Sequence, residues 1–189
     1  MTLVPVPEAG LAIPVPDAWR LVTAAELADP ATVAELAATY PGAQALLASM
    51  DSLGGRATPV LLAVDDSAAG TSAALTPNIS VLITQPSVQG PLLDFVAGFI
   101  ADGLAKALGS EAPERERVQL AVGEAIRLRY AMTAADGTAL RADAWVIGAP
   151  AGTVLVTVMG PAPVVDGLGP DALASAITPL EGGGPTASP

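Results

Sequence analysis

Apolar and polar residues alternate in the second half of the chain, and this alternation indicates paired β-strands. Residues 117–133 and 138–148 repeat with a period of two, which is the pattern of strands with one buried face. Gly123 interrupts the first run and predicts a bend or a bulge there. Asp136-Gly137 separates the two runs, and this dipeptide is among the strongest signals of a tight hairpin turn. We therefore predict a long β-hairpin that turns at this dipeptide.

The position of the turn decides which side chains of the hairpin share a face. With that dipeptide as the turn, Leu128 lies opposite Trp145. Arg127 and Arg129 then project from one face, and Arg141 projects from the other. A shift of one residue would reverse these assignments, because successive side chains of a strand point to opposite faces.

Residues 91–108 carry apolar residues at helical spacing and predict a helix. Pro91 suits the first turn, because its missing N–H is not needed there, and Gly109 is a natural stop. Two neighbouring apolar stripes are expected to lie on the sheet. They consist of Leu92, Val96, Phe99 and Gly103, and of Leu93, Ile100, Leu104 and Leu108.

Shorter apolar runs, bounded by Gly, Pro and polar residues, predict the remaining elements. Strands are expected at 9–15, 57–65, 78–84 and 152–159, and helices at 24–28, 31–39, 42–52 and 171–180. Residues 152–159 are apolar almost throughout, which indicates a central strand covered on both sides. Residues 160–169 are rich in Pro and Gly and predict a loop.

This order of elements predicts an α+β protein. Consecutive hairpins give a largely antiparallel sheet, and helices must cover its apolar faces, so we expect an αβα sandwich. The predicted organisation is an N-terminal arm over 1–8, a single domain over 9–180 and a disordered tail over 181–189.

The amino-acid composition limits the kinds of partner that the protein is expected to bind. The chain has 19 acidic and 8 basic residues and a formal net charge of −11. Such a surface repels phosphate backbones and anionic lipids, so we expect neither a nucleic-acid partner nor a membrane partner. The N-terminal residues lack the basic start and the long apolar run of a secretory signal, which predicts a cytoplasmic protein. Heavy use of Ala, Gly, Pro, Val and Arg is typical of a GC-rich genome, such as that of an actinobacterium.

The absence of His and Cys removes most catalytic chemistry. Ser-His-Asp and Cys-His centres are excluded, zinc sites of the usual ligand types nearly so, and we expect no enzyme, cofactor or metal site. Lys106 and Ser110 have the spacing of a Ser-Lys pair, but a solvated helix end explains them as well. Asp65-Asp66 is either a cation site or an acidic turn at the end of a strand.

Charged residues on the predicted strands are the remaining candidates. Residues 114–117 alternate Glu and Arg, which indicates either a guarded edge strand or an edge that docks a partner. Arg127, Arg129 and Arg141 are the candidate partner-binding residues, as a basic spot for an anionic ligand or an acidic partner. The alternative is that they pair across the sheet with Glu124, Asp136 or Asp143.

Three segments carry a resemblance to a known family. Residues 11–19 read Leu-Ala-Ile-Pro-Val-Pro-Asp-Ala-Trp, residues 78–81 read Asn-Ile-Ser-Val, and residues 123–128 read Gly-Glu-Ala-Ile-Arg-Leu before the long hairpin. This pattern resembles PsbP-like domains, a superfamily that includes LpqN-type lipoproteins and DcrB-related type VI secretion adaptors. The chain differs from the lipoprotein type because it has no Cys for a lipid anchor.

The resemblance implies a function as well as a fold. It implies an αβα sandwich and a non-catalytic, protein-binding accessory factor, such as an adaptor or chaperone of a secretion or assembly system. The alternative is a small-molecule or lipid-binding domain with an apolar cleft between the 91–108 helix and the sheet.

Overall fold

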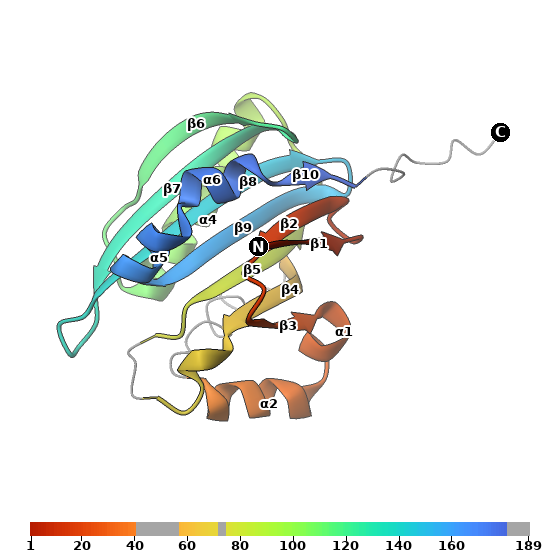
Figure 1. Cartoon of the computed structure of the whole chain (residues 1–189). Helices are drawn as coiled ribbons and strands as arrows, with labels where there is room; N and C mark the ends of the chain where they lie inside the picture. The colour runs from red at the N-terminus through yellow and green to blue at the C-terminus, as the bar shows by residue number, and fades with distance from the viewer. Residues whose placement is uncertain (41–56, 72–74, 181–189) are drawn as a thin grey trace.

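The computed structural model describes residues 1–40, 57–71 and 75–180, and the chain forms an α+β fold around a large antiparallel sheet (Figure 1). The predicted helix at 42–52 and the predicted tail at 181–189 lie outside the described residues. The seven strands of the large sheet, in spatial order, are β3 (Trp19–Thr23), β4 (Ala57–Asp65), β5 (Asn78–Thr84), β9 (Gly152–Pro161), β8 (Ala139–Ala149), β7 (Gly123–Thr133) and β6 (Glu114–Leu120). All neighbouring pairs in this order are antiparallel.

Further elements cover both faces of this sheet. A three-stranded sheet comprises β1 (Thr2–Val6), β2 (Leu11–Val15) and β10 (Thr178–Pro179). The helices are α1 (Ala24–Leu27), α2 (Pro30–Thr39), α4 (Pro91–Leu108), α5 (Ala162–Leu168) and α6 (Pro170–Ser175). In Figure 1 the small sheet, α5 and α6 lie in front of the large sheet, and α4 lies behind it. The predicted α+β class with an antiparallel sheet is confirmed.

Strand β9 is the middle strand, and both of its faces are buried. Every residue from Gly152 to Gly160 is buried, as the apolar run predicted. Leu155 packs in the core beneath α4, whereas its neighbours Val154 and Val156 pack in the core beneath the small sheet, α5 and α6. The two cores lie on opposite faces of one sheet, so the layers on both sides are needed to keep β9 from water.

Local signals fix the ends of the helices. Helix α1 begins with a capping box, in which the Glu26 carboxylate accepts the backbone N–H of Thr23 at 2.8 Å. This hydrogen bond lowers the pKa of Glu26 below its usual value. Helix α4 begins at Pro91 and ends before Gly109, which has the left-handed φ of 63°. The predicted bounds of this helix are confirmed.

Two segments that the sequence predicted to lack regular structure belong to the fold. The expected arm at 1–8 contains β1, whose residues pair antiparallel with β2. The expected loop at 160–169 contains the end of β9 and helix α5, which the fully buried Val165 anchors. The Pro and Gly residues there start and stop a short helix, because Pro is accepted in a first turn and Gly at a helix end. The final predicted helix is correspondingly shorter and ends at Ser175.

The turn of the β7–β8 hairpin is one residue longer than predicted. The backbone N–H of Ala134 donates to the carbonyl of Thr138 at 2.9 Å, so Ala135, Asp136 and Gly137 form a three-residue loop. Gly137 has a φ of 86°, as expected for a turn that ends in a left-handed residue.

The longer loop shifts the pairing of β7 with β8 by one residue, and the predicted pairing of Leu128 with Trp145 is wrong. Arg127 lies opposite Trp145, and Arg129 lies opposite Asp143. Because a shift of one residue exchanges the faces, Arg141 lies on the same face as the other two arginines and not on the opposite one.

The orientation of α4 can be tested with two neighbouring leucines. Leu93 is 0% exposed and Leu92 is 61% exposed. Leu93→Ala should therefore lower the free energy of unfolding by about 2–5 kcal/mol, because it leaves a cavity in the core. Leu92→Ala should change it by about 0.5 kcal/mol or less. Urea denaturation at equilibrium measures both, and equal effects would contradict the rotation of α4 described above.

Candidate functional site

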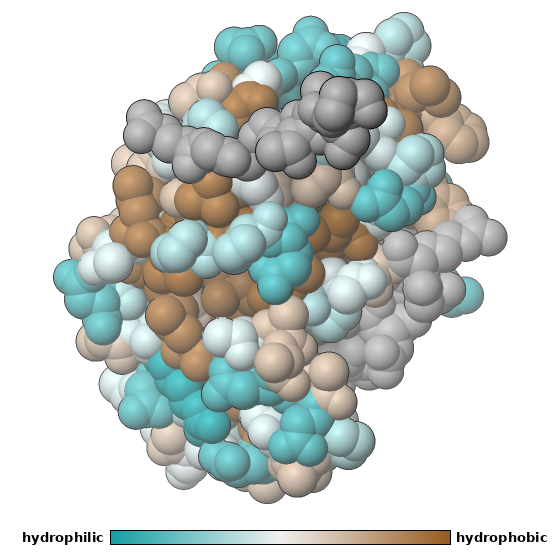
Figure 2. Space-filling model, turned by 90° about the vertical axis from the view of Figure 1, so that its right-hand side faces the viewer, coloured by the Kyte–Doolittle hydropathy of each residue, from teal (hydrophilic) through white to brown (hydrophobic). Residues whose placement is uncertain are grey.

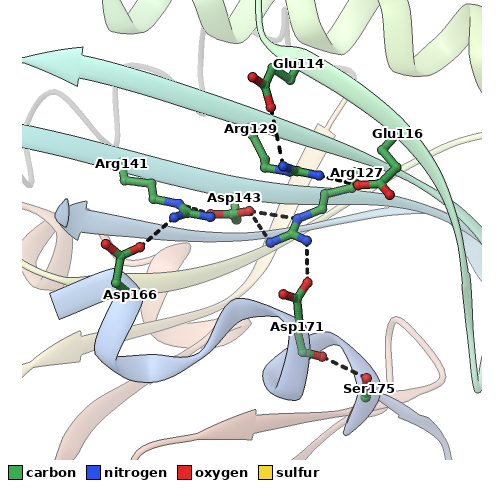
Figure 3. A network of polar contacts seen from close by, with 9 residues as sticks. All are labelled: Glu114, Glu116, Arg127, Arg129, Arg141, Asp143, Asp166, Asp171 and Ser175. Atoms are coloured by element: carbon green, nitrogen blue, oxygen red, sulfur yellow. Dashed lines mark hydrogen bonds and ion pairs between the residues drawn. The ribbon is translucent and has the colours of Figure 1, made fainter. Parts of the chain in front are cut away.

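Two of the three candidate arginines, Arg127 and Arg141, share an ion-pair network at the junction of β7, β8 and the C-terminal helices (Figure 3). Its centre is Asp143, which is 0% exposed and accepts hydrogen bonds from two arginines. The Nε of Arg127 donates to Oδ1 of Asp143 at 2.8 Å, and the Nε of Arg141 donates to Oδ2 at 2.6 Å. A buried carboxylate needs such partners, because an unpaired charge in the interior is costly.

The same two arginines reach from the sheet to the helices above it. Arg127 also binds Asp171 on α6, and its guanidinium lies 5.6 Å from the centroid of the Trp145 ring. Arg141 binds Asp166 on α5 at 2.5 Å. The hydrogen bonds to both aspartates raise the pKa of Arg141 above its usual value. The network therefore fastens α5 and α6 to the hairpin.

Arg129 forms its ion pairs with the edge strand β6 and not with Asp143. Its guanidinium pairs with Glu116 and, at 3.4 Å, with Glu114, and both carboxylates come from β6. The Nε of Arg129 is buried and has no hydrogen-bond partner. The pair with Glu114 is loose, because the Glu114 side chain is 80% exposed.

This arrangement contains more acid than base. The predicted pairing with Asp143 is confirmed, whereas Glu124 pairs with Arg117, and Asp136 accepts the backbone N–H of Thr138 in the hairpin turn. An anionic ligand would have to displace carboxylates that already hold the arginines. The assignment of Arg127, Arg129 and Arg141 as partner-binding residues stays a prediction.

The remaining polar candidates have structural contacts. Lys106 is exposed, and the Ser110 hydroxyl donates to the carbonyl of Glu111 at 3.1 Å. Asp65 accepts the backbone N–H of Ser67 at 3.0 Å. The neighbouring Asp66 accepts the Tyr40 hydroxyl at 2.6 Å. The described residues contain no group of three or more Asp and Glu side chains placed to hold a metal ion.

The outer face of α4 is the feature that sequence reasoning placed wrongly. The chain has two phenylalanines, Phe95 and Phe99, and they lie one helical turn apart. They are 75% and 57% exposed, and Leu92 beside them is 61% exposed. Large aromatic side chains are usually buried, so an exposed aromatic pair next to a leucine makes this face a candidate interaction surface. We call Leu92, Phe95 and Phe99 the α4 ridge.

A cavity adjoins the α4 ridge. It has a volume of about 350 Å³ and lies between α4 and the ends of β4 and β5. Apolar side chains form most of its lining, with Thr84 and Gln85 as the polar members among the described residues. Its walls are formed by Ala57, Thr84, Gln85, Phe95, Val96, Phe99 and Ile100.

The side of α4 that packs on the sheet explains why the sequence misplaced the ridge. Two small residues, Ala97 and Ala101, are fully buried in the middle of that side, with Leu93, Ile100 and Leu104 around them. Small side chains let the helix lie close to the sheet, but they add little to an apolar stripe read from sequence. The stripe that includes Phe99 therefore looked like part of the core.

Exposed apolar residues also occur on the side of the molecule where β1 and α1 lie. Figure 2 shows hydrophobic side chains across the middle of this side, with hydrophilic residues above and below them. Leu3 on β1 is 49% exposed and Leu21 on β3 is 41% exposed. Both are aliphatic and less exposed than the α4 ridge, so the ridge is the stronger candidate for recognition.

Comparison with known proteins gives a likeness of fold. No protein-family model and no curated protein matches the chain. Among solved structures, it is similar to LpqN, described as involved in cell envelope biogenesis of Mycobacterium tuberculosis, with a TM-score of 0.44 and 15% sequence identity over 89% of this chain and 82% of LpqN. A likeness at this level says nothing about activity or partners. Within the described residues, no helix has the length and hydropathy that crossing a bilayer requires.

The central carboxylate of the network should be far more important than an outer one. Asp143→Asn removes a charge that two arginines share at a fully buried position. It should lower the free energy of unfolding by about 3 kcal/mol or more. Asp171→Asn removes a partner that is 87% exposed, and should cost about 1 kcal/mol or less. Urea denaturation compares the two, and a similar cost for both would contradict a buried network centred on Asp143.

Proposed function

We propose that this protein is a non-catalytic binding protein that docks a partner protein on the α4 ridge. The observation that carries the proposal is the exposure of Phe95 and Phe99 on one helical face. Aromatic residues are enriched in the centres of protein interfaces and depleted from free surfaces. An amphipathic segment of a partner that places one apolar side chain in the adjoining cavity suits this ridge.

Charges around the ridge define the partner further. Arg115 pairs with Asp102 at 3.6 Å, and Arg117 pairs with Asp94, along the flank of α4 that faces β6. Each of the six arginines that the structure describes pairs with a carboxylate. The acidic residues in excess keep the surface negative, so a neutral or basic partner should associate faster than an acidic one.

The finer expectations belong to the same proposal. They are that the protein is an adaptor or chaperone of a secretion or assembly system, acts in the cytoplasm and belongs to the PsbP-like superfamily. The first and the last rest on the resemblance in residues 11–19, 78–81 and 123–128, and the cytoplasmic location stays a prediction from the sequence. The identity of the docked protein tests them.

Site-specific photo-crosslinking in cells of the source organism tests the docking surface. Benzoylphenylalanine at position 99 should give a discrete protein adduct, whereas the same label at Val164 on α5, which is 37% exposed, should not. Adding Phe95→Ser should reduce the adduct about fivefold or more, because truncating an interface anchor costs about 1 kcal/mol or more. The melting temperature of the Phe95→Ser variant should stay near that of the protein without this substitution, because Phe95 is exposed. Equal adducts at both positions, or an adduct that ignores Phe95, would contradict the proposal.

A second candidate function is supported by the cavity itself. Its volume of about 350 Å³ and its apolar walls suit a small apolar ligand between α4 and the sheet. Such a ligand corresponds to the alternative function that the sequence analysis left open. Native mass spectrometry of the purified protein should then show a bound mass, and Val96→Trp, which fills the space, should remove it. A clean mass of the protein alone would favour the partner protein.

A further inference from the structure

Strand β7 extends beyond β6, the strand that pairs with its outer edge. The pairing of β6 with β7 begins at Glu114 and Arg129, but β7 continues to Thr133. Its last four residues, 130–133, pair with β8 alone. No backbone hydrogen bond from another described segment reaches them on the other side. We call residues 130–133 the open edge.

The direction of the backbone groups follows from the hairpin turn. The N–H of Ala134 points to β8, since it donates to the carbonyl of Thr138. In an antiparallel strand, successive residues direct their N–H and C=O groups to alternate sides. Ala131 and Thr133 therefore direct theirs away from β8, towards the open edge.

The two parts of this sheet edge differ in chemistry. Residues 114–117 of β6 are Glu, Arg, Glu and Arg, all exposed, and such charges discourage pairing with another chain. The open edge reads Tyr-Ala-Met-Thr and has neither a charge nor a proline. It therefore lacks the features that normally prevent a further strand from adding to an edge.

A cleft lies along the open edge. It has a volume of about 880 Å³, and its opposite wall is the connection from α4 to β6, including Ser110 and Glu111. The hydroxyl of Tyr130 donates to the Ala101 carbonyl at 3.3 Å, and burial raises the pKa of this tyrosine. This phenol stays protonated and fixed in the wall. The cleft offers space for an extended segment beside the open edge.

The charged side chains around the cleft limit the kinds of polypeptide segment that can bind there. The lining contains two arginines, Arg129 and Arg141, and the three carboxylates of Glu111, Glu114 and Asp166. With the net charge of −11, this balance repels an acidic segment.

We propose that the open edge binds an extended segment of another polypeptide, neutral or basic in charge, as an added strand that pairs with Ala131 and Thr133. This site is separate from the α4 ridge, so either can fail without the other. Main-chain hydrogen bonds supply the affinity, and alternate side chains of the segment contact the cleft walls.

A proline substitution offers a matched pair of variants in one hairpin. Ala131→Pro removes a donor that faces the open edge and leaves the bonds to β8 in place. Ala135→Pro makes the same change in the turn, where the Gly137 N–H donates to the Ala134 carbonyl and proline is favoured at the second position. Ala131→Lys is a second variant that adds a charge to the edge and does not depend on proline being accepted.

Selection from a phage-displayed library of random seven-residue peptides tests the proposal with the full chain as target. Enriched peptides should be neutral or basic and should bind the wild type and Ala135→Pro with similar Kd. They should bind Ala131→Pro and Ala131→Lys about tenfold more weakly. At a concentration of about ten times its Kd, a peptide should slow amide hydrogen exchange at Ala131 and Thr133 about tenfold.

Three results would overturn the proposal. They are a selection that enriches no peptide, peptides that bind the position-131 variants as well as the wild type, and protection that falls outside the open edge. Protection along α4 would assign the peptides to the α4 ridge and leave the open edge without a partner. Circular dichroism shows whether each variant is folded, and if Ala131→Pro is not, Ala131→Lys decides.

Discussion

The burial of β9 on both faces is the constraint on which the rest of the fold depends. A central strand with apolar residues on both sides cannot face water, so each face of the sheet needs its own cover. On one face α4 supplies it, and on the other the small sheet, α5 and α6 do. The two cores share the strands but no side chains, because successive residues of each strand point to opposite faces.

The two sides of α4 differ in the side chains they carry. Alanines in the middle of its buried side bring the helix close to the sheet, and the larger Leu and Ile side chains seal the margins. The phenylalanines are not needed for that contact and lie on the outer face. Leu92, Phe95 and Phe99 thus add exposed apolar surface to a side of the helix that also carries Asp94, Asp102 and Lys106.

The sequence allowed most of the fold to be predicted, because its strongest signals are local. The alternating runs, Pro91, Gly109 and the capping box at Thr23 act within a few residues, and most of the elements they predicted are present. The bend or bulge predicted at Gly123 is instead a tight turn, from which β7 runs back antiparallel to β6. The register of the β7–β8 hairpin was not predictable in the same way, because a dipeptide signal does not distinguish a two-residue turn from a three-residue one. The arginine cluster was therefore assigned to two faces, although its members share one.

The candidate sites were harder to predict for a different reason. Exposure of Phe99 depends on which side of a helix meets the sheet, and this is decided by contacts with strands distant in sequence. The end of β6 opposite Arg129 depends on where the α4–β6 connection joins the sheet. Neither property has a signature within a short window of residues. Both become visible only when the layers are assembled.

The ion pairs around Asp143 also oppose any shift in the pairing of β7 with β8. If β8 slid by one residue along β7, the carboxylate would move to the α4 side of the sheet, into an apolar core. The two arginines would lose it at the same moment, and the aspartates of α5 and α6 would have no cation to hold. A sheet with this shifted pairing would thus have unpaired charges on both faces. Their burial would raise the free energy of the shifted structure and leave that of the native structure unchanged. The network thereby selects one arrangement among several that satisfy the hydrophobic pattern almost equally well.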